Sequence, residues 1–241
     1  MIRAVIVGGD SPRSKNLRQD LEGSGYFQVE IQPRILPADL DEYDLDVEPS
    51  DQRYGRDLSI TERCCALAHQ RAQKRIRSNG GVILEDDAVV LDVHVFAAYA
   101  SWAVESNKGV LLNLSSTNCA EEINWEFENN RVVRTCGPSA LAVGYAASSE
   151  VLCQLIDANL SLQYVADWPP IRASHYRLKF PVVAHGHRDY ESLIAGTTSR
   201  DSVPLASLLL NFQFRTFVGR LIYKSDHEIT KLLLKLAGAK S

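Results

Sequence analysis

The sequence predicts an α/β fold with a mostly parallel central sheet. Strand-like and helix-like segments alternate along most of the 241 residues, which is the order typical of such folds. The run Val82-Ile83-Leu84 is apolar without interruption, as expected for a strand buried on both faces. The length suits one substantial domain and is short for two.

The composition narrows the class of protein. With 45% hydrophobic and 23% charged residues, the chain is expected to form an ordinary globular core. Its net charge of −4 argues against nucleic-acid binding as the main activity, because such binding depends on neutralising phosphates. The five cysteines include no CxxC pair, so neither a disulfide framework nor a zinc site is indicated.

The lengths of the apolar segments indicate where in the cell the protein is expected. The N-terminal apolar run is too short for a signal peptide. No stretch approaches the ~18 uninterrupted apolar residues of a membrane span. We therefore expect a cytoplasmic protein.

The first third of the chain begins with two strands and a helix between them. The apolar run at 3–8 ends in a glycine turn and predicts the first strand. Residues 15–24 have a helical pattern, and the alternation at 27–31 predicts the second strand. The acidic stretch from Asp39 to Asp51 is expected to be an exposed loop.

The next helix carries the clearest local signals. Ser59 and Glu62 have the spacing of a capping box, and the helix is expected to run to about Arg77, before the glycines that end it. Its apolar face is expected to consist of Ile60, Cys64, Leu67, Ala68, Ala72 and Ile76.

Weaker patterns complete the prediction. After the strand at 82–84 we expect a helix at 92–106, a strand at 110–114, a polar irregular segment at 118–131, a strand at 141–147, a helix at 149–160 and a strand at 179–184.

Three acids in a row, Glu85, Asp86 and Asp87, directly follow the buried strand. Burying an uncompensated carboxylate is costly, so such groups bind a cation, pair with bases or face water. Ligands of open α/β sheets bind at the carboxyl ends of strands, where Mg²⁺ or Mn²⁺ shares carboxylates with substrate phosphates. On an extended chain Glu85 and Asp87 would share one side. The alternative is that the acids begin a solvated loop.

Two segments around these acids resemble a known family. Arg56–His69 is similar to the GEIGCALSH-like helix of glycosyltransferase family 25, and Val82–Ala88 is similar to its LVLEDDA-like strand, in the same order and at the right spacing. The resemblance covers roughly residues 1–195 and continues weakly at Gly144–Ser148, Val165–Trp168 and Glu191–Ile194.

The resemblance implies a GT-A type nucleotide-sugar-binding fold over residues 1–202. It implies an inverting hexosyltransferase that uses Mn²⁺ or Mg²⁺ and a UDP-sugar, UDP-galactose above all, to build a cell-surface glycan or glycolipid such as lipooligosaccharide. The chain departs from the family pattern at Thr61 and at Gly8-Gly9-Asp10. Because of these departures, a non-catalytic nucleotide-sugar-binding relative stays open as an alternative. A metal-dependent phosphohydrolase is a second alternative, since acids after a parallel strand also serve phosphate cleavage.

Within this interpretation each candidate residue has a role and an ordinary alternative. Asp87 and Asp86 are expected to hold the metal and diphosphate, with Glu85 in support and Arg13 contacting phosphate. Each acid has solvation as its alternative, and Arg13 has a surface salt bridge.

The remaining candidates lie later in the chain. Asp167 is the candidate base that takes the proton of the acceptor hydroxyl, or else a turn aspartate before Pro169-Pro170. His187, which alternates with His185, is a candidate metal ligand or a surface residue. His69 is expected to be a hydrogen-bonded packing histidine.

The C-terminal segment at 203–241 is treated as a separate extension. It holds six Lys or Arg residues, two Asp or Glu residues and several large apolar residues. This pattern is typical of a basic amphipathic helix, which either lies on an anionic membrane near a lipid-linked acceptor or packs on the domain.

Overall fold

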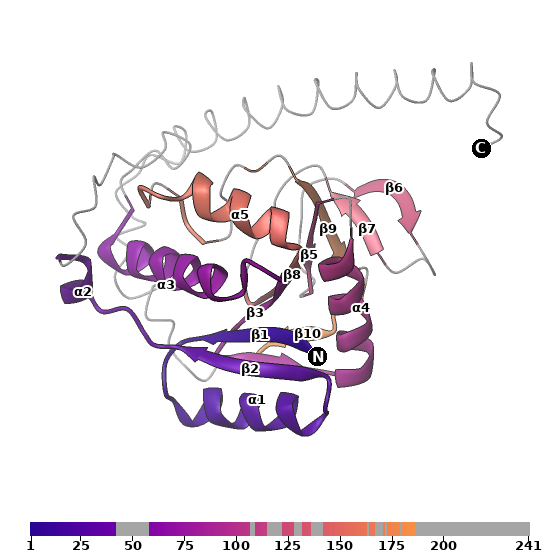
Figure 1. The fold of residues 1–241 in the computed structure, drawn as a ribbon, viewed down its shortest axis with the longest axis horizontal. Helices are drawn as coiled ribbons and strands as arrows, with labels where there is room; N and C mark the ends of the chain where they lie inside the picture. The colour runs from indigo at the N-terminus through magenta and orange to yellow at the C-terminus, as the bar shows by residue number, and fades with distance from the viewer. Residues whose placement is uncertain are drawn as a thin grey trace, which may run out of the picture. The chain divides into compact units, whose positions relative to one another are not determined.

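A computed structural model of the chain has a mixed α/β fold, which confirms the predicted class (Figure 1). The structure describes residues 1–41, 58–106, 109–114, 132–135, 142–162, 164–166, 171, 173–178 and 180–186, and the backbone of 122–127. All of them belong to one compact unit. The expected C-terminal extension lies outside the described residues.

Ten strands and five helices make up the described part of the chain. In order they are β1 (Ile2–Val7), α1 (Pro12–Gly23), β2 (Phe27–Gln32), α2 (Pro37–Asp41), α3 (Ile60–Ile76), β3 (Gly81–Glu85), β4 (Ala88–Val90), α4 (Val93–Glu105), β5 (Val110–Asn113), β6 (Glu122–Phe127), β7 (Val132–Thr135), β8 (Gly144–Ala147), α5 (Ser149–Ala158), β9 (Ser174–Leu178) and β10 (Val183–His185).

The main sheet has eight strands in the order β2-β1-β3-β8-β5-β9-β7-β6. β1 runs parallel to both β2 and β3, and β5 runs parallel to β9. β8 is antiparallel to β3 and β5, and β7 is antiparallel to β9 and β6. Most strands thus point in one direction, with β8 and β7 reversed. A separate two-stranded ribbon pairs β4 with β10.

Helices cover both faces of the sheet (Figure 1). The alternation of β1 explains why: Ala4 and Ile6 join the apolar cluster under α1 and α4, whereas Val5 and Val7 join the cluster under α3 and α5. Val82, Ile83 and Leu84 of β3 are fully buried between the two layers, as predicted. The carboxyl end of β3 therefore emerges from the centre of the fold.

A capping box fixes the start of α3, the helix that precedes this strand. The Ser59 side chain accepts a hydrogen bond from the Glu62 amide at 3.2 Å, and Glu62 accepts one from the Ser59 amide at 2.8 Å, so the predicted capping box is confirmed. The predicted apolar face of α3 is buried except for Ile60, which is the first helical residue and is 58% exposed.

The structure differs from the expected elements at three places. β6 lies inside the segment expected to be irregular, β9 was not expected, and the late strand begins at Val183 rather than at 179. The first residues of the acidic stretch form the end of α2. β9 reads Ser-His-Tyr-Arg-Leu, which is too polar to predict a strand; pairing with β5 and β7 on both sides satisfies its backbone instead.

Among the described residues, no helix has both the length and the apolar character that crossing a bilayer requires.

Candidate functional site

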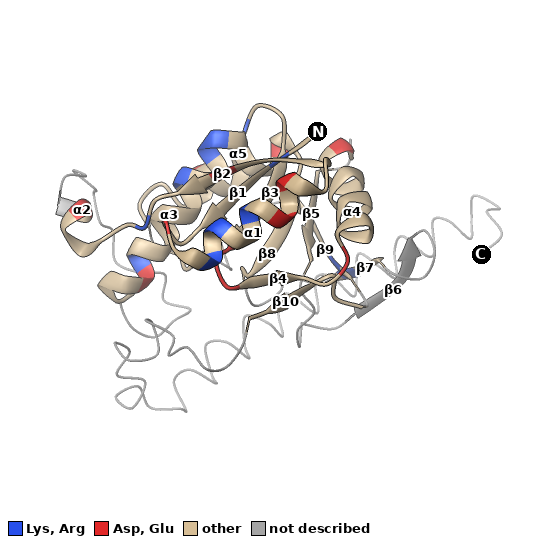
Figure 2. Cartoon of the chain, turned by 90° about the horizontal axis from the view of Figure 1, so that it is seen from below, with Lys and Arg blue, Asp and Glu red and all other residues tan. Residues whose placement is uncertain are grey.

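The three acids form a partly buried feature that we call the acidic turn, Glu85–Asp87. Glu85 ends β3, and Asp86 and Asp87 form a tight turn that leads into β4. Figure 2 shows this turn in red beside α1. The expectation of an extended chain fails here, because the turn breaks the alternation of side chains and directs each acid to a different element.

Asp86 faces the loop between β1 and α1. Its Oδ2 accepts hydrogen bonds from Ser11 Oγ at 3.1 Å and from an Arg13 guanidinium nitrogen at 3.4 Å. Gly8 lies directly under this carboxylate: a Cβ at Gly8 would come within 2.5 Å of the Asp86 Cβ and Cγ. The bare backbone of Gly8 therefore lets the carboxyl ends of β1 and β3 approach each other closely.

Asp87 faces the β4–β10 ribbon. Its Oδ2 lies 3.2 Å from His185 Nε2, and its carbonyl accepts a hydrogen bond from the Gly186 amide at 2.6 Å. Its other carboxylate oxygen, Oδ1, is buried and has no hydrogen-bond partner among the described residues. Burial, followed by the neighbouring charge of Glu85, raises the pKa of Asp87 above the ordinary carboxyl value, although His185 opposes this.

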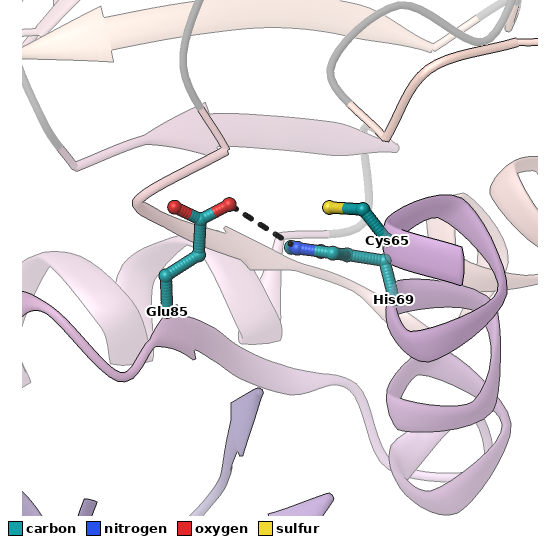
Figure 3. A group of neighbouring side chains, drawn as sticks. All are labelled: Cys65, His69 and Glu85. Carbon is teal, nitrogen blue, oxygen red and sulfur yellow. Dashed lines mark ion pairs between the residues drawn. The ribbon is translucent and has the colours of Figure 1, made fainter. Parts of the chain in front are cut away.

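Glu85 turns toward α3. Its Oε1 lies 3.4 Å from His69 Nε2, and the Cys65 thiol is close to both (Figure 3). Because Cys65 and His69 are four residues apart, they share one face of α3. The Glu85 side chain therefore points to α3 on one side of β3, whereas the Asp86 side chain points to Ser11 and Arg13 on the other.

His69 is buried behind this group. It is 1% exposed, and its Nδ1 lies 3.3 Å from the Tyr145 hydroxyl, which also accepts a hydrogen bond from Gln73 at 3.0 Å. Burial disfavours a charged imidazole, but Tyr145, Cys65 and Glu85 outweigh it and raise the pKa of His69 well above its ordinary value.

Comparison with known protein families and with curated proteins finds no match for this chain. The geometry of the chain's own residues must therefore support any function that is proposed.

The structure brings together four of the candidates from the sequence. Arg13 and Asp86 are in contact, and Glu85 and Asp87 flank them. Asp167 and His187 lie outside the described residues, so their roles stay predictions. Two contacts were not expected from the sequence: His185 pairs with Asp87, and Tyr145 pairs with His69. A signal for His185 existed, since it alternates with His187 after a strand, whereas nothing local marks Tyr145.

Proposed function

We propose that the protein is an inverting, metal-dependent glycosyltransferase with a GT-A type fold. The donor is a UDP-sugar, for which UDP-galactose is the first candidate, and the acceptor is a cell-surface glycan or glycolipid. The observation that supports this most is the position of Asp86 and Asp87. They stand at the carboxyl end of a central buried strand, beside the glycine loop of β1, where open α/β sheets bind nucleotides.

The donor atoms at the turn fit a hard cation such as Mn²⁺ or Mg²⁺. Asp87 Oδ1 is buried and has no hydrogen-bond partner, so it is an oxygen whose desolvation nothing in the described residues compensates. Carboxylate oxygens are the ligands that such cations prefer. Asp87, with Asp86 beside it, would hold the ion, which would neutralise the donor diphosphate as the sugar–phosphate bond breaks.

Arg13 and the glycine loop supply the rest of the phosphate environment. The guanidinium lies near Asp86 and remains 39% exposed, so it can turn from that carboxylate to a phosphate oxygen. Ser11, which caps the N-terminus of α1, lies two residues before Arg13. The absence of a side chain at Gly8 lets the Asp86 carboxylate lie against the loop that follows β1, next to Ser11 and Arg13. We assign Asp167 as the base and His187 as an additional ligand within this proposal.

Calorimetric titration tests the proposal with a panel of nucleotide diphosphate sugars, each with Mn²⁺ and with a chelator. We expect one UDP-sugar to bind only when the metal is present. The Asp87→Asn variant keeps the shape of the side chain and removes its charge, and should weaken this binding at least about 100-fold, since a lost metal ligand costs several kcal/mol. Asp157→Asn removes an exposed carboxylate on α5 and should leave binding unchanged.

The outcomes separate the three functions. Metal-dependent binding followed by transfer to a glycan acceptor supports the glycosyltransferase. Tight binding with no transfer to any acceptor indicates the non-catalytic relative, and acceptor-independent release of phosphate indicates the phosphohydrolase. Binding that is indifferent to both metal and Asp87, or no binding to any donor, would exclude the proposed site.

A further inference from the structure

A second group of metal-ligating side chains lies on the opposite side of β3 from Arg13. Cys65 and His69 of α3 and Glu85 of β3 each offer one ligand atom, and these three atoms all lie within 4.8 Å of one another (Figure 3). We propose that Cys65 Sγ, His69 Nε2 and a Glu85 oxygen bind Zn²⁺. This site is distinct from the one proposed for a hard cation at Asp86 and Asp87, and it does not rest on the glycosyltransferase activity.

The separation of the His69 and Glu85 atoms fits a shared cation better than a direct hydrogen bond. Their 3.4 Å separation is long for a charged N–H···O bond, which is usually about 2.7–2.9 Å. Within the described part of the chain, His69 Nε2 has no hydrogen-bond partner. In a tetrahedral zinc site with bonds of about 2.0–2.1 Å, nitrogen and oxygen ligands lie about 3.3–3.4 Å apart. The two atoms therefore already have the spacing of neighbouring zinc ligands.

The cysteine needs only a small adjustment to join them. A sulfur ligand at about 2.3 Å from zinc lies about 3.6 Å from the nitrogen and oxygen ligands. Since the sulfur is at most 4.8 Å from both atoms, a side-chain rotation of about 1 Å is enough. Cys65 sits one helical turn before His69, so both approach the ion from the same face of α3.

The environment behind His69 resembles that of zinc ligands in general. A ligating histidine usually has its second ring nitrogen hydrogen-bonded, which fixes the orientation of the ring. His69 Nδ1 has this contact with the Tyr145 hydroxyl. Tyr145 is oriented in turn by Gln73. With zinc bound, a hydrogen on Nδ1 would point to the Tyr145 hydroxyl, and the Nε2 lone pair would face Cys65 and Glu85.

A soft thiolate combined with an imidazole selects zinc over magnesium. The spacing of the cysteines did not indicate such a site, because only one ligand is a cysteine: Cys65 and His69 come from successive turns of α3, and Glu85 comes from a strand. Glu85 is 28% exposed, so a water or a substrate oxygen can complete the four-coordinate site. Zinc here would cross-link α3 to the start of the acidic turn.

Cobalt is the probe for the test. The full-length protein is freed of metal with a chelator and titrated with Co²⁺, whose absorption reports both sulfur ligation and tetrahedral geometry. We expect one equivalent to produce a thiolate-to-cobalt charge-transfer band that Zn²⁺ abolishes. Cys65→Ser should remove this band, whereas Cys153→Ser, which changes an exposed cysteine on α5, and Asp87→Asn should keep it.

A second measurement needs no variant. The wild-type protein is alkylated with and without Zn²⁺, and the modified cysteines are located by peptide fragmentation. Zinc should slow alkylation of Cys65 at least about 10-fold and leave Cys153 unchanged. The proposal is overturned if wild-type protein gives no charge-transfer band, if the band survives in folded Cys65→Ser protein, or if zinc does not protect Cys65. Retention of the band in Asp87→Asn separates this result from failure of the hard-cation site.

Discussion

The contact between Gly8 and Asp86 allows a quantitative test of how the acidic turn is held. Gly8 has a φ of +143°, and an added Cβ would lie 2.5 Å from the Asp86 Cβ and Cγ and 2.8 Å from its Oδ1. Comfortable contacts between carbon atoms are about 3.5–4.0 Å, so Gly8→Ala must displace Asp86 by about 1 Å. Asp86 resists this movement because Ser11 and Arg13 hold its carboxylate.

Two costs add in this variant. A side chain at this φ strains the backbone by about 1–3 kcal/mol, and overpacking against Asp86 adds about 1–3 kcal/mol. We therefore expect the free energy of unfolding to fall by about 2–6 kcal/mol. Gly25→Ala is the matched control: Gly25 has a φ of +76° with nothing within 4 Å of an added Cβ, so it should lose only the strain, about 1–2 kcal/mol.

Urea unfolding followed by circular dichroism measures both variants, with midpoints compared at unchanged m-value. If Gly8→Ala and Gly25→Ala lose the same stability, then Asp86 is not held against the glycine loop and the reasoning is refuted. In the proposed enzyme, a displacement of about 1 Å at the phosphate site should also lower the rate of sugar transfer about 100-fold.

Two further predictions concern the dependence of stability on pH, measured by urea unfolding. The hydrogen bond from Arg3, assisted by Arg75, lowers the pKa of Glu30 although burial opposes this. The stability that this carboxylate contributes is present above pH 4.5 and is lost as pH falls through the lowered pKa, so Glu30→Gln should flatten the curve below pH 4.5. Burial lowers the pKa of His175 to about 4, so the unfolded chain binds more protons between pH 6.5 and 4. As the pH is lowered across that window, the free energy of unfolding should fall by at most about 3 kcal/mol. His175→Gln should remove this loss. If the variant shows the same dependence of stability on pH as the wild type, His175 is not its cause.

The parts of the fold that were predictable are those determined by neighbours in sequence. The capping box needs only Ser59 and Glu62, and the buried strand needs only its three apolar residues. The acids that follow this strand were located correctly for the same reason. Local pattern also placed Asp92 at the start of α4, where its side chain accepts from the His94 and Val95 amides.

The parts that were not predictable depend on pairing between distant segments. The run at 141–147 indicates a buried strand but not its direction, and β8 proved antiparallel to both of its neighbours. The contacts of the three acids also depend on distant elements. His185 reaches Asp87 only because β10 pairs with β4, and Tyr145 reaches His69 only because β8 lies beside β3.

The β4–β10 ribbon also has a consequence for the order of folding. It joins Val89 to Ala184, roughly 95 positions along the chain, and closing so long a loop costs about 4 kcal/mol of chain entropy. Pairing of β1 with β2 joins positions only about 25 apart, and β3, which pairs with β1 about 78 positions away, precedes β10 by roughly 100 residues. During synthesis the first strands therefore assemble early, whereas Asp87 acquires His185 and Gly186 as neighbours only after the late segment has emerged. Because each strand of the ribbon has only one partner strand, whereas the central strands have two, the ribbon should open more readily, and amide exchange at Gly186 should report this opening.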